Sequence, residues 1–178
     1  MSRRTLAAFA LAVLVVVPTR AHAEVGGGSA NAASGGTAYV TPPTPGTITP
    51  DGLAVAPGGA PPQVAAIIAW GNRIAKRPYR YGGGHRRFTD TAYDCSGSIS
   101  YALRGAALLK APLDSTAFMD WGDAGPGLWV SVYANRGHAY ILVAGLRFDT
   151  SGRTTAGSRW QLAPRSAKGF AVRHPRGL

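Results

Sequence analysis

The sequence has little cysteine and few acidic residues: one Cys, and 8 Asp and Glu among 178 residues. A single cysteine excludes an internal disulfide framework and a cysteine-rich zinc module, which needs several ligands close together. Charged residues make up only 15% of the chain, which excludes a highly charged disordered protein. The length is typical of one domain, and 24 Gly and 13 Pro indicate a flexible segment beside it.

The sequence also lacks the roughly 20 consecutive apolar residues that a membrane-spanning helix needs. Its long apolar run covers only residues 6–17, and it follows two arginines. Small residues at Ala21 and Ala23 then match the pattern that a signal peptidase reads. We therefore expect residues 1–23 to be a signal peptide, and the protein to be secreted, periplasmic or cell-wall associated without stable membrane insertion.

Residues 24–62 are rich in glycine and proline and contain no lysine or arginine. Their apolar residues are small and follow neither a helical nor a strand period, so this segment buries too little surface to offset the entropy of ordering it. We predict a flexible Gly/Pro-rich linker over residues 24–62 and one folded, catalytic domain over residues 63–178.

The formal net charge is +11, and the positive excess falls in the predicted folded domain. Such a charge suits binding to the phosphates of nucleic acid, but no nucleic-acid-binding motif is present and export argues against that partner. Carboxylates and phosphates of a bacterial wall are an alternative, since a basic surface concentrates a protein on them. We expect anionic wall polymers as partners and no nucleic acid. The remaining interpretation is that arginine only decorates the surface.

Helical periodicity precedes strand-like segments in the predicted domain. Pro62 suits the first turn of a helix. Apolar residues then recur at helical spacing, and Pro78 ends this helical pattern. Asn135-Arg136-Gly137 lies between two runs of β-branched and aromatic residues, which predicts a hairpin. Helices followed by antiparallel strands indicate an α+β domain. The expected helices cover residues 62–76 and 96–109, and the expected strands cover residues 128–134, 138–144, 146–149 and 170–174.

The cysteine lies in the motif Asp94-Cys95-Ser96-Gly97, where a predicted loop changes into a predicted helix. The positive end of a helix dipole stabilises a thiolate and lowers its pKa. The N–H groups of a first helical turn have no internal partner and are suited to hold an oxyanion. Although a lone cysteine is also consistent with a buried apolar residue or an intermolecular disulfide, this context favours a reactive thiol.

A thiolate nucleophile needs a base, and histidine is the usual one. His138 opens an apolar strand, which holds a side chain at a fixed angle, so we expect His138 to be the base rather than a turn residue. His85 lies in a Gly-rich, Arg-flanked loop and is expected to face solvent. His174 is expected at the surface or at a strand edge. Neither a cofactor nor a metal is expected.

Three segments together resemble the NlpC/P60 cysteine peptidases: Pro78-Tyr79-Arg80-Tyr81-Gly82-Gly83, Tyr93-Asp94-Cys95-Ser96-Gly97-Ser98 and Gly137-His138. The resemblance implies a papain-like fold, in which the cysteine begins a helix packed on a β-sheet. It also implies hydrolysis of amide bonds in the stem peptides of peptidoglycan, often between D-γ-glutamate and a diamino acid.

By this resemblance Cys95 is the nucleophile and His138 the general base, while Tyr79 and Ser96 contact the oxyanion or the substrate. The family's third polar residue follows shortly after the base, where this chain has Asp149. A carboxylate there would orient the imidazole, as in a Ser-His-Asp triad. The alternative is that Asp149 only caps a turn.

Two departures from the family pattern keep other functions open. The loop over residues 84–93 is longer than usual, and the third polar position holds Asp149. One alternative is a catalytically impaired wall-binding or scaffold module with the same fold. Another is an acyltransferase that uses the same thiolate with an amine acceptor.

Overall fold

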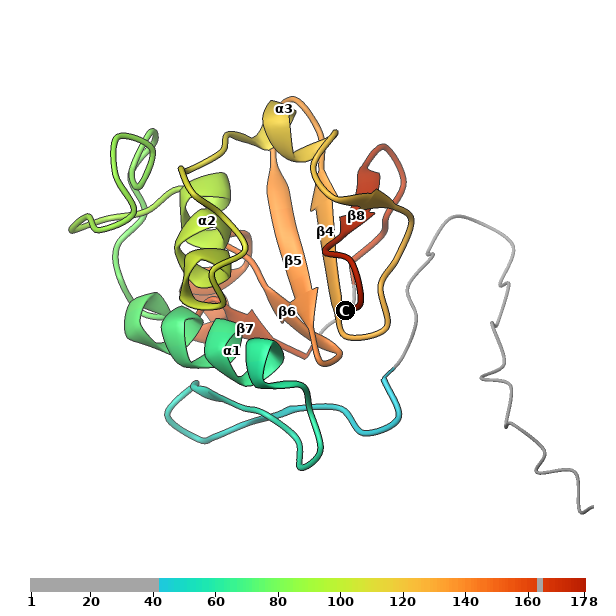
Figure 1. Cartoon of the computed structure of the whole chain (residues 1–178). Coiled ribbons are helices and arrows are strands. Elements are labelled where there is room, and N and C mark those ends of the chain that lie inside the picture. Colours follow the sequence, from blue (N-terminus) through green and yellow to red (C-terminus); the bar gives the residue numbers. More distant parts are fainter. Residues whose placement is uncertain (1–41, 163–164) are drawn as a thin grey trace, which may run out of the picture.

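The computed structural model describes residues 42–162 and 165–178. A six-stranded sheet forms one layer, and helices α1 (Pro62–Ile74) and α2 (Cys95–Gly105) pack together on one face of it (Figure 1). Every strand pair in the sheet is antiparallel. The mixture of helices and antiparallel strands confirms the predicted α+β class. The predicted signal peptide, residues 1–23, lies outside the described residues.

The sheet has the strand order β3-β8-β4-β5-β6-β7, which places β4 and β5 at its centre. Two short helices and a separate two-stranded hairpin, β1–β2, complete the described part of the chain. The remaining elements are α3 (Ser115–Phe118), α4 (Arg153–Ala156), β1 (Thr47–Ile48), β2 (Ala54–Val55), β3 (Asp123–Ala124), β4 (Val130–Ala134), β5 (Ala139–Val143), β6 (Leu146–Phe148), β7 (Trp160–Gln161) and β8 (Ala171–His174).

Helix α1 matches the predicted helix closely, with Pro62 in its first turn and its last residue at Ile74. Val64, Ile67 and Ile68 follow the helical spacing and are buried against the sheet and α2. Because burying each such side chain contributes about 1.5–3 kcal/mol, this face docks the helix on the core.

Helix α2 begins at Cys95 because the side chain of Asp94 accepts a hydrogen bond from the Gly97 N–H at 2.8 Å and so caps the helix. It ends at Gly105, earlier than predicted. Trp70 of α1 crosses here so closely that a Cβ on Gly105 would lie 2.2 Å from the Trp70 Cγ. Glycine is therefore required where the two helices meet.

The predicted hairpin is confirmed as β4–β5, with Ala134 opposite Ala139 in the register. The Asn135 side chain accepts hydrogen bonds from the N–H groups of Gly137 and His138, both at 2.9 Å. These bonds close the turn and set His138 immediately before the buried strand β5. Strand β6 follows after a turn at Gly145, which has a φ of 78°.

The predicted flexible linker over residues 24–62 does not extend to residues 46–61, which belong to the fold. The Asn72 side chain of α1 pairs with both the N–H and the carbonyl of Ala54 at 2.9 Å, and the Gly46 N–H donates to the Ala144 carbonyl at 2.8 Å. Besides these hydrogen bonds, Ala54 is buried in the core and Ile48 and Leu53 pack against it, but the apolar residues of this segment follow no regular period, so hydrophobic patterning does not reveal it. Residues 24–41 lie outside the described part of the chain.

Candidate active site

The three residues predicted to be catalytic lie at the ends of neighbouring elements. Cys95 is the first residue of α2, which packs against β5. His138 immediately precedes β5, and Asp149 immediately follows β6, the neighbour of β5 in the sheet. The packing of α2 on the sheet therefore brings together residues that are far apart in the sequence.

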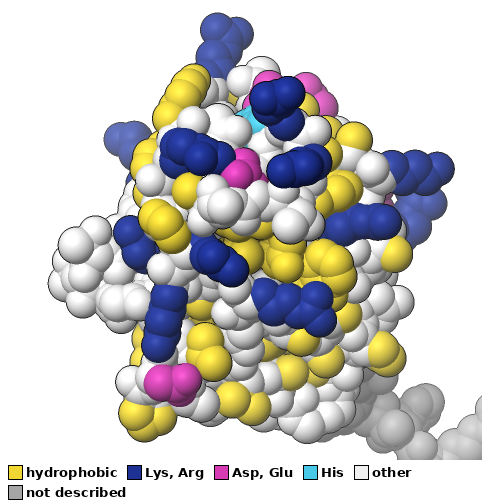
Figure 2. Space-filling view, turned by 90° about the vertical axis from the view of Figure 1, so that its left-hand side faces the viewer, with side chains coloured by type: hydrophobic (Ala, Val, Ile, Leu, Met, Phe, Trp, Pro, Cys, Tyr) yellow, Lys and Arg dark blue, Asp and Glu magenta, His cyan; other side chains and the backbone are white. Residues whose placement is uncertain are grey.

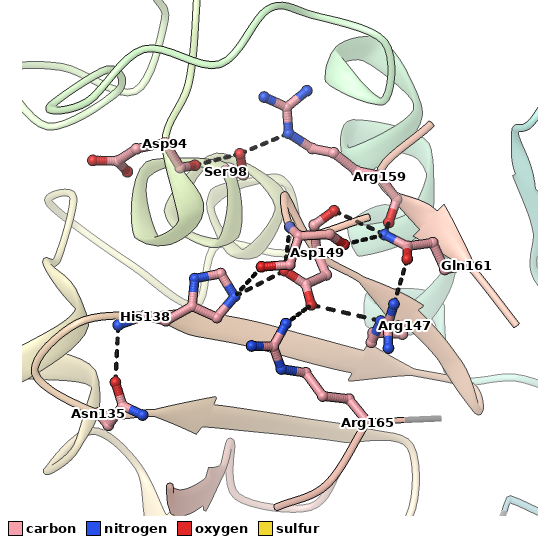
Figure 3. Close-up of polar contacts among 10 residues, drawn as sticks. Asp94, Ser98, Asn135, His138, Arg147, Asp149, Arg159, Gln161 and Arg165 are labelled. Atoms are coloured by element: carbon pink, nitrogen blue, oxygen red, sulfur yellow. Dashed lines mark hydrogen bonds and ion pairs between the residues drawn. The ribbon is translucent and has the colours of Figure 1, made fainter. Parts of the chain in front are cut away.

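His138 contacts both Cys95 and Asp149. Its Nε2 lies 2.9 Å from Oδ1 of Asp149 (Figure 3). Cys95 and the imidazole also interact closely enough to shift each other's pKa, and because Nε2 faces Asp149, Nδ1 is the ring nitrogen left for the sulfur. The Asp149 side chain has no exposed surface and His138 is 18% exposed. The structure thus brings together Cys95, His138 and Asp149 in the predicted order of contacts.

Asp149 also stabilises the turn that follows it, as the alternative interpretation expects. The Ser151 N–H donates to its Oδ1 at 2.8 Å. The two interpretations of Asp149 are therefore compatible, because one carboxylate oxygen accepts hydrogen bonds from both the turn and the imidazole.

The electrostatic environment favours a thiolate–imidazolium pair. Burial opposes a charged imidazole at His138, but the hydrogen bonds to Asp149 and Cys95 and the charges of these two groups raise its pKa to about 9. Burial also raises the pKa of the Cys95 thiol, but the hydrogen bonds to His138 and to the Ala139 N–H, with the imidazolium charge, lower that pKa overall. Both shifts favour the charged forms at neutral pH.

The first turn of α2 supplies two backbone donors beside the sulfur. The Gly97 N–H donates to the Asp94 side chain at 2.8 Å, and the Ser98 N–H donates to the Asp94 carbonyl at 3.0 Å. Among the described residues, the N–H groups of Cys95 and Ser96 have no hydrogen-bond acceptor. They are suited to stabilise negative charge that develops on a carbonyl oxygen next to the thiolate.

Tyr79 and Ser96, both expected to contact the oxyanion or the substrate, differ in the exposure of their side chains. Burial raises the pKa of the half-exposed Tyr79 hydroxyl, and the charges of Cys95 and Asp94 add to this shift, so Tyr79 is near enough to interact electrostatically with both. The Ser96 hydroxyl is instead buried, 3.2 Å from Nε2 of His85 and 3.5 Å from Oδ1 of Asp94. Only the backbone N–H of Ser96 is therefore free to contact a substrate.

His85 does not simply face solvent, so this expectation is wrong. Its Nε2 lies 2.9 Å from Oδ1 of Asp94, and its side chain is 29% exposed. The other Asp94 oxygen accepts from the Gly82 N–H at 2.9 Å. A Cβ on Gly97 would lie 2.1 Å from the Gly83 carbonyl oxygen, so the Gly-rich loop lies directly on the start of α2. The predicted loop is thus a fixed part of the site.

Two arginines that the sequence interpretation missed hold Asp149. Arg165 donates from Nη1 to Oδ2 at 3.0 Å, and Nε of Arg147 lies 3.6 Å from the same oxygen. Gln161 contributes as well, because its side chain accepts from Arg147 and donates to the Asp149 carbonyl. These groups satisfy a carboxylate that would be costly to bury alone. The sequence did carry a signal for the contact with Arg147, because Arg147 and Asp149 are two residues apart in the predicted strand over residues 146–149 and so share one face of it.

Arg159, for which the sequence suggests no role, is fully buried behind the site. Its guanidinium donates to the carbonyls of Ile74, Arg77 and Tyr93 at 2.6, 2.7 and 3.0 Å, and to the Ser98 hydroxyl at 2.9 Å (Figure 3). Burial lowers the pKa of Arg159 to about 10. This one side chain joins the end of α1, the Gly-rich loop and the start of α2, and so fixes the segments around Cys95.

Within residues 42–162 and 165–178, the His, Cys, Asp and Glu side chains form no group of three that could hold a metal ion. No helix in this part of the chain is long and apolar enough to cross a membrane. No protein-family model matches the chain, and no curated protein matches it either.

Proposed function

We propose that the protein is a cysteine peptidase with a papain-like fold that hydrolyses amide bonds in peptidoglycan stem peptides. The observation that carries this proposal is the chain of contacts from Cys95 through His138 to Asp149, with opposite pKa shifts on the thiol and the imidazole. The resemblance of the segments around Tyr79 and Cys95 to the NlpC/P60 peptidases supports the substrate class, with a D-γ-glutamyl to diamino acid bond as the bond cleaved.

In the first half of the reaction, the Cys95 thiolate attacks the scissile carbonyl carbon and a sulfur–carbon bond forms. The negative charge moves to the carbonyl oxygen, where the N–H groups of Cys95 and Ser96 are available to stabilise it and the resemblance assigns the Tyr79 hydroxyl the same role. The His138 imidazolium then gives its proton to the leaving nitrogen, the carbon–nitrogen bond breaks, and an amine and a thioester result.

In the second half, neutral His138 takes a proton from a water molecule as that water attacks the thioester. The carbon–sulfur bond breaks, a carboxylic acid is released, and the thiolate–imidazolium pair is restored. The Asp149 carboxylate holds the ring through Nε2 and stabilises the imidazolium.

The test uses purified peptidoglycan and defined muropeptides, with products identified by mass spectrometry. The full-length protein is expected to release new amines and cleaved stem peptides, while Cys95→Ala and His138→Ala release none. Lys168→Ala, an exposed position, serves as the matched control and is expected to retain activity. Product masses that show joining to an added amine would instead identify an acyltransferase. If the wild-type protein releases nothing from any wall type tested, hydrolysis is the wrong reaction.

A further inference from the structure

Exposed cations gather on the helical side of the molecule. Six Lys and Arg side chains there are exposed and have no ion-pair partner among the described residues. Asp90 and Asp94 are already engaged, with Arg80 at 2.6 Å and with His85 at 2.9 Å. A hydrogen bond from Thr49 and, to a smaller extent, the charge of Lys76 lower the pKa of Asp51, which forms no ion pair with Lys76. Figure 2 shows lysine and arginine side chains, with a few acidic ones among them, on the side of the molecule formed by α1, α2 and the loop between them. We call this the basic face; its residues are Arg73, Lys76, Arg77, Arg86, Arg87 and Arg104.

Aromatic side chains join these cations into one continuous surface. The Arg73 guanidinium lies 4.7 Å over the Trp70 ring, and Trp70 packs on Gly105 at the crossing of the two helices. The neighbouring Arg104 lies 5.5 Å over the ring of Phe88, which directly follows the arginine pair of the loop. Cation–π contacts thus hold the guanidinium groups of both helices in place while leaving them exposed.

Most arginines in the rest of the described chain are buried or ion-paired. Arg147 and Arg159 are buried inside the molecule. Others are matched with carboxylates at its surface: Arg173 with Asp120, and Arg176 with Asp123. Of the ten described Lys and Arg residues that are neither buried nor ion-paired, six therefore lie on the basic face, and the other four, Lys110, Arg136, Arg153 and Lys168, lie outside it.

The basic face adjoins the candidate active site. Arg86 and Arg87 follow directly after His85, whose ring lies 2.9 Å from Asp94, the capping residue immediately before Cys95. A ligand that lies along this face is consequently held next to the nucleophile.

We propose that the basic face binds a long phosphate-bearing polymer of the same wall that carries the peptidoglycan substrate. Five of its six residues are arginines, which bind phosphate oxygens bidentately and stay charged at any relevant pH. The cations spread over two helices and a loop rather than converge on a pocket, which suits an extended chain and not a small anion. The choice of a wall polymer rests on the proposed function, whereas binding of a polyanion does not.

The experiment measures sedimentation of the full-length Cys95→Ala protein with purified walls at rising NaCl, before and after chemical removal of their phosphate polymers. The same measurement is made with Arg77→Glu/Arg87→Glu in that background. Among the described residues, neither Arg77 nor Arg87 lies over an aromatic ring, and circular dichroism checks that the variant is folded. The matched control is Arg136→Glu/Lys168→Glu, which makes the same change of charge at exposed positions outside the basic face.

Removal of the polymers, or reversal of Arg77 and Arg87, is expected to weaken wall binding at least about tenfold, which corresponds to about 1.4 kcal/mol. The control is expected to change it much less, and salt is expected to weaken it steadily. Equal binding to treated and untreated walls, or equal loss in both double variants, would overturn the proposal. Tighter binding to duplex DNA or to anionic vesicles than to the isolated polymer would overturn it too. This binding measurement does not depend on peptidoglycan cleavage, because the Cys95→Ala protein lacks the nucleophile. Failure of the wild-type protein to cleave peptidoglycan would therefore not affect the result.

Discussion

Nε2 of His138 lies 2.9 Å from Oδ1 of Asp149, a carboxylate with no exposed surface. This contact fixes the orientation of the imidazole, so that Nδ1 is left for the Cys95 thiol. It also contributes to the raised pKa of His138, because a buried negative charge favours the protonated ring.

Asp149→Asn removes the negative charge and keeps the size of the side chain. We expect kcat/KM for muropeptide cleavage to fall by about 10²–10⁴-fold, because the ring loses both its orientation and the charge that stabilises the imidazolium. The pKa of His138 is expected to fall, which a pH profile of kcat/KM would record. Thr150→Ala, next in the sequence, is the control and should retain activity; equal losses in the two variants would contradict the role of Asp149.

Alkylation of Cys95 by iodoacetamide reports how much thiolate is present. The lowered pKa of Cys95 and the pKa of about 9 for His138 predict fast alkylation of the wild-type protein below pH 7. In His138→Ala, no imidazolium counters the increase in the thiol pKa that burial causes. The alkylation rate at pH 7 is therefore expected to fall by about 10–100-fold, since an ordinary thiol is only slightly ionised at that pH. A rate that rises only above pH 8 in the wild-type protein would refute the ion pair.

Arg165→Met tests how far the surrounding arginines tune the base. Arg165 lies 3.0 Å from Oδ2 of Asp149, and its positive charge partly offsets the effect of this carboxylate on His138. Its removal is expected to raise the pKa of His138 above about 9. Because the imidazolium protonates the leaving amine, the alkaline limb of the kcat profile should move to higher pH. Arg165→Lys, which keeps the charge, should leave the limb near its wild-type position.

Arg159→Met leaves the carbonyls of Ile74, Arg77 and Tyr93 buried without their donor. We expect the free energy of unfolding to fall by about 3–5 kcal/mol, measured by urea denaturation. Arg159→Lys should restore only part of the stability, because an ammonium group cannot reproduce the planar fork of donors. A full rescue by lysine would show that charge alone matters at this position.

Gly97→Ala places a methyl group 2.1 Å from the Gly83 carbonyl oxygen. The Gly-rich loop must then move away from α2, which we expect to destabilise the protein by about 1–3 kcal/mol and to lower activity strongly. Gly58→Ala is a suitable control, since nothing lies within 4 Å of the added carbon there. Thermal unfolding and muropeptide cleavage measured together separate the loss of stability from the loss of activity.

Local patterns were enough to predict α1 and the β4–β5 hairpin, because helical spacing and turn residues act over a few neighbours along the chain. The same holds for Cys95 at a helix start, which the capping by Asp94 produces. The strand β7 and the hairpin β1–β2 escaped prediction. Each of these strands has only two residues, too few for an alternating pattern, and partners distant in the sequence hold both elements in place.

The sequence by itself determined the α+β class and a reactive-cysteine hypothesis with His138 and Asp149 as its partners. Only the tertiary structure decided that His85 binds Asp94, that two arginines hold Asp149 and that Arg159 is buried. The physical reason is that burial and pairing depend on which distant segments pack together. An arginine in the sequence therefore does not reveal whether it will satisfy buried carbonyls, neutralise a carboxylate or stay exposed on a basic face.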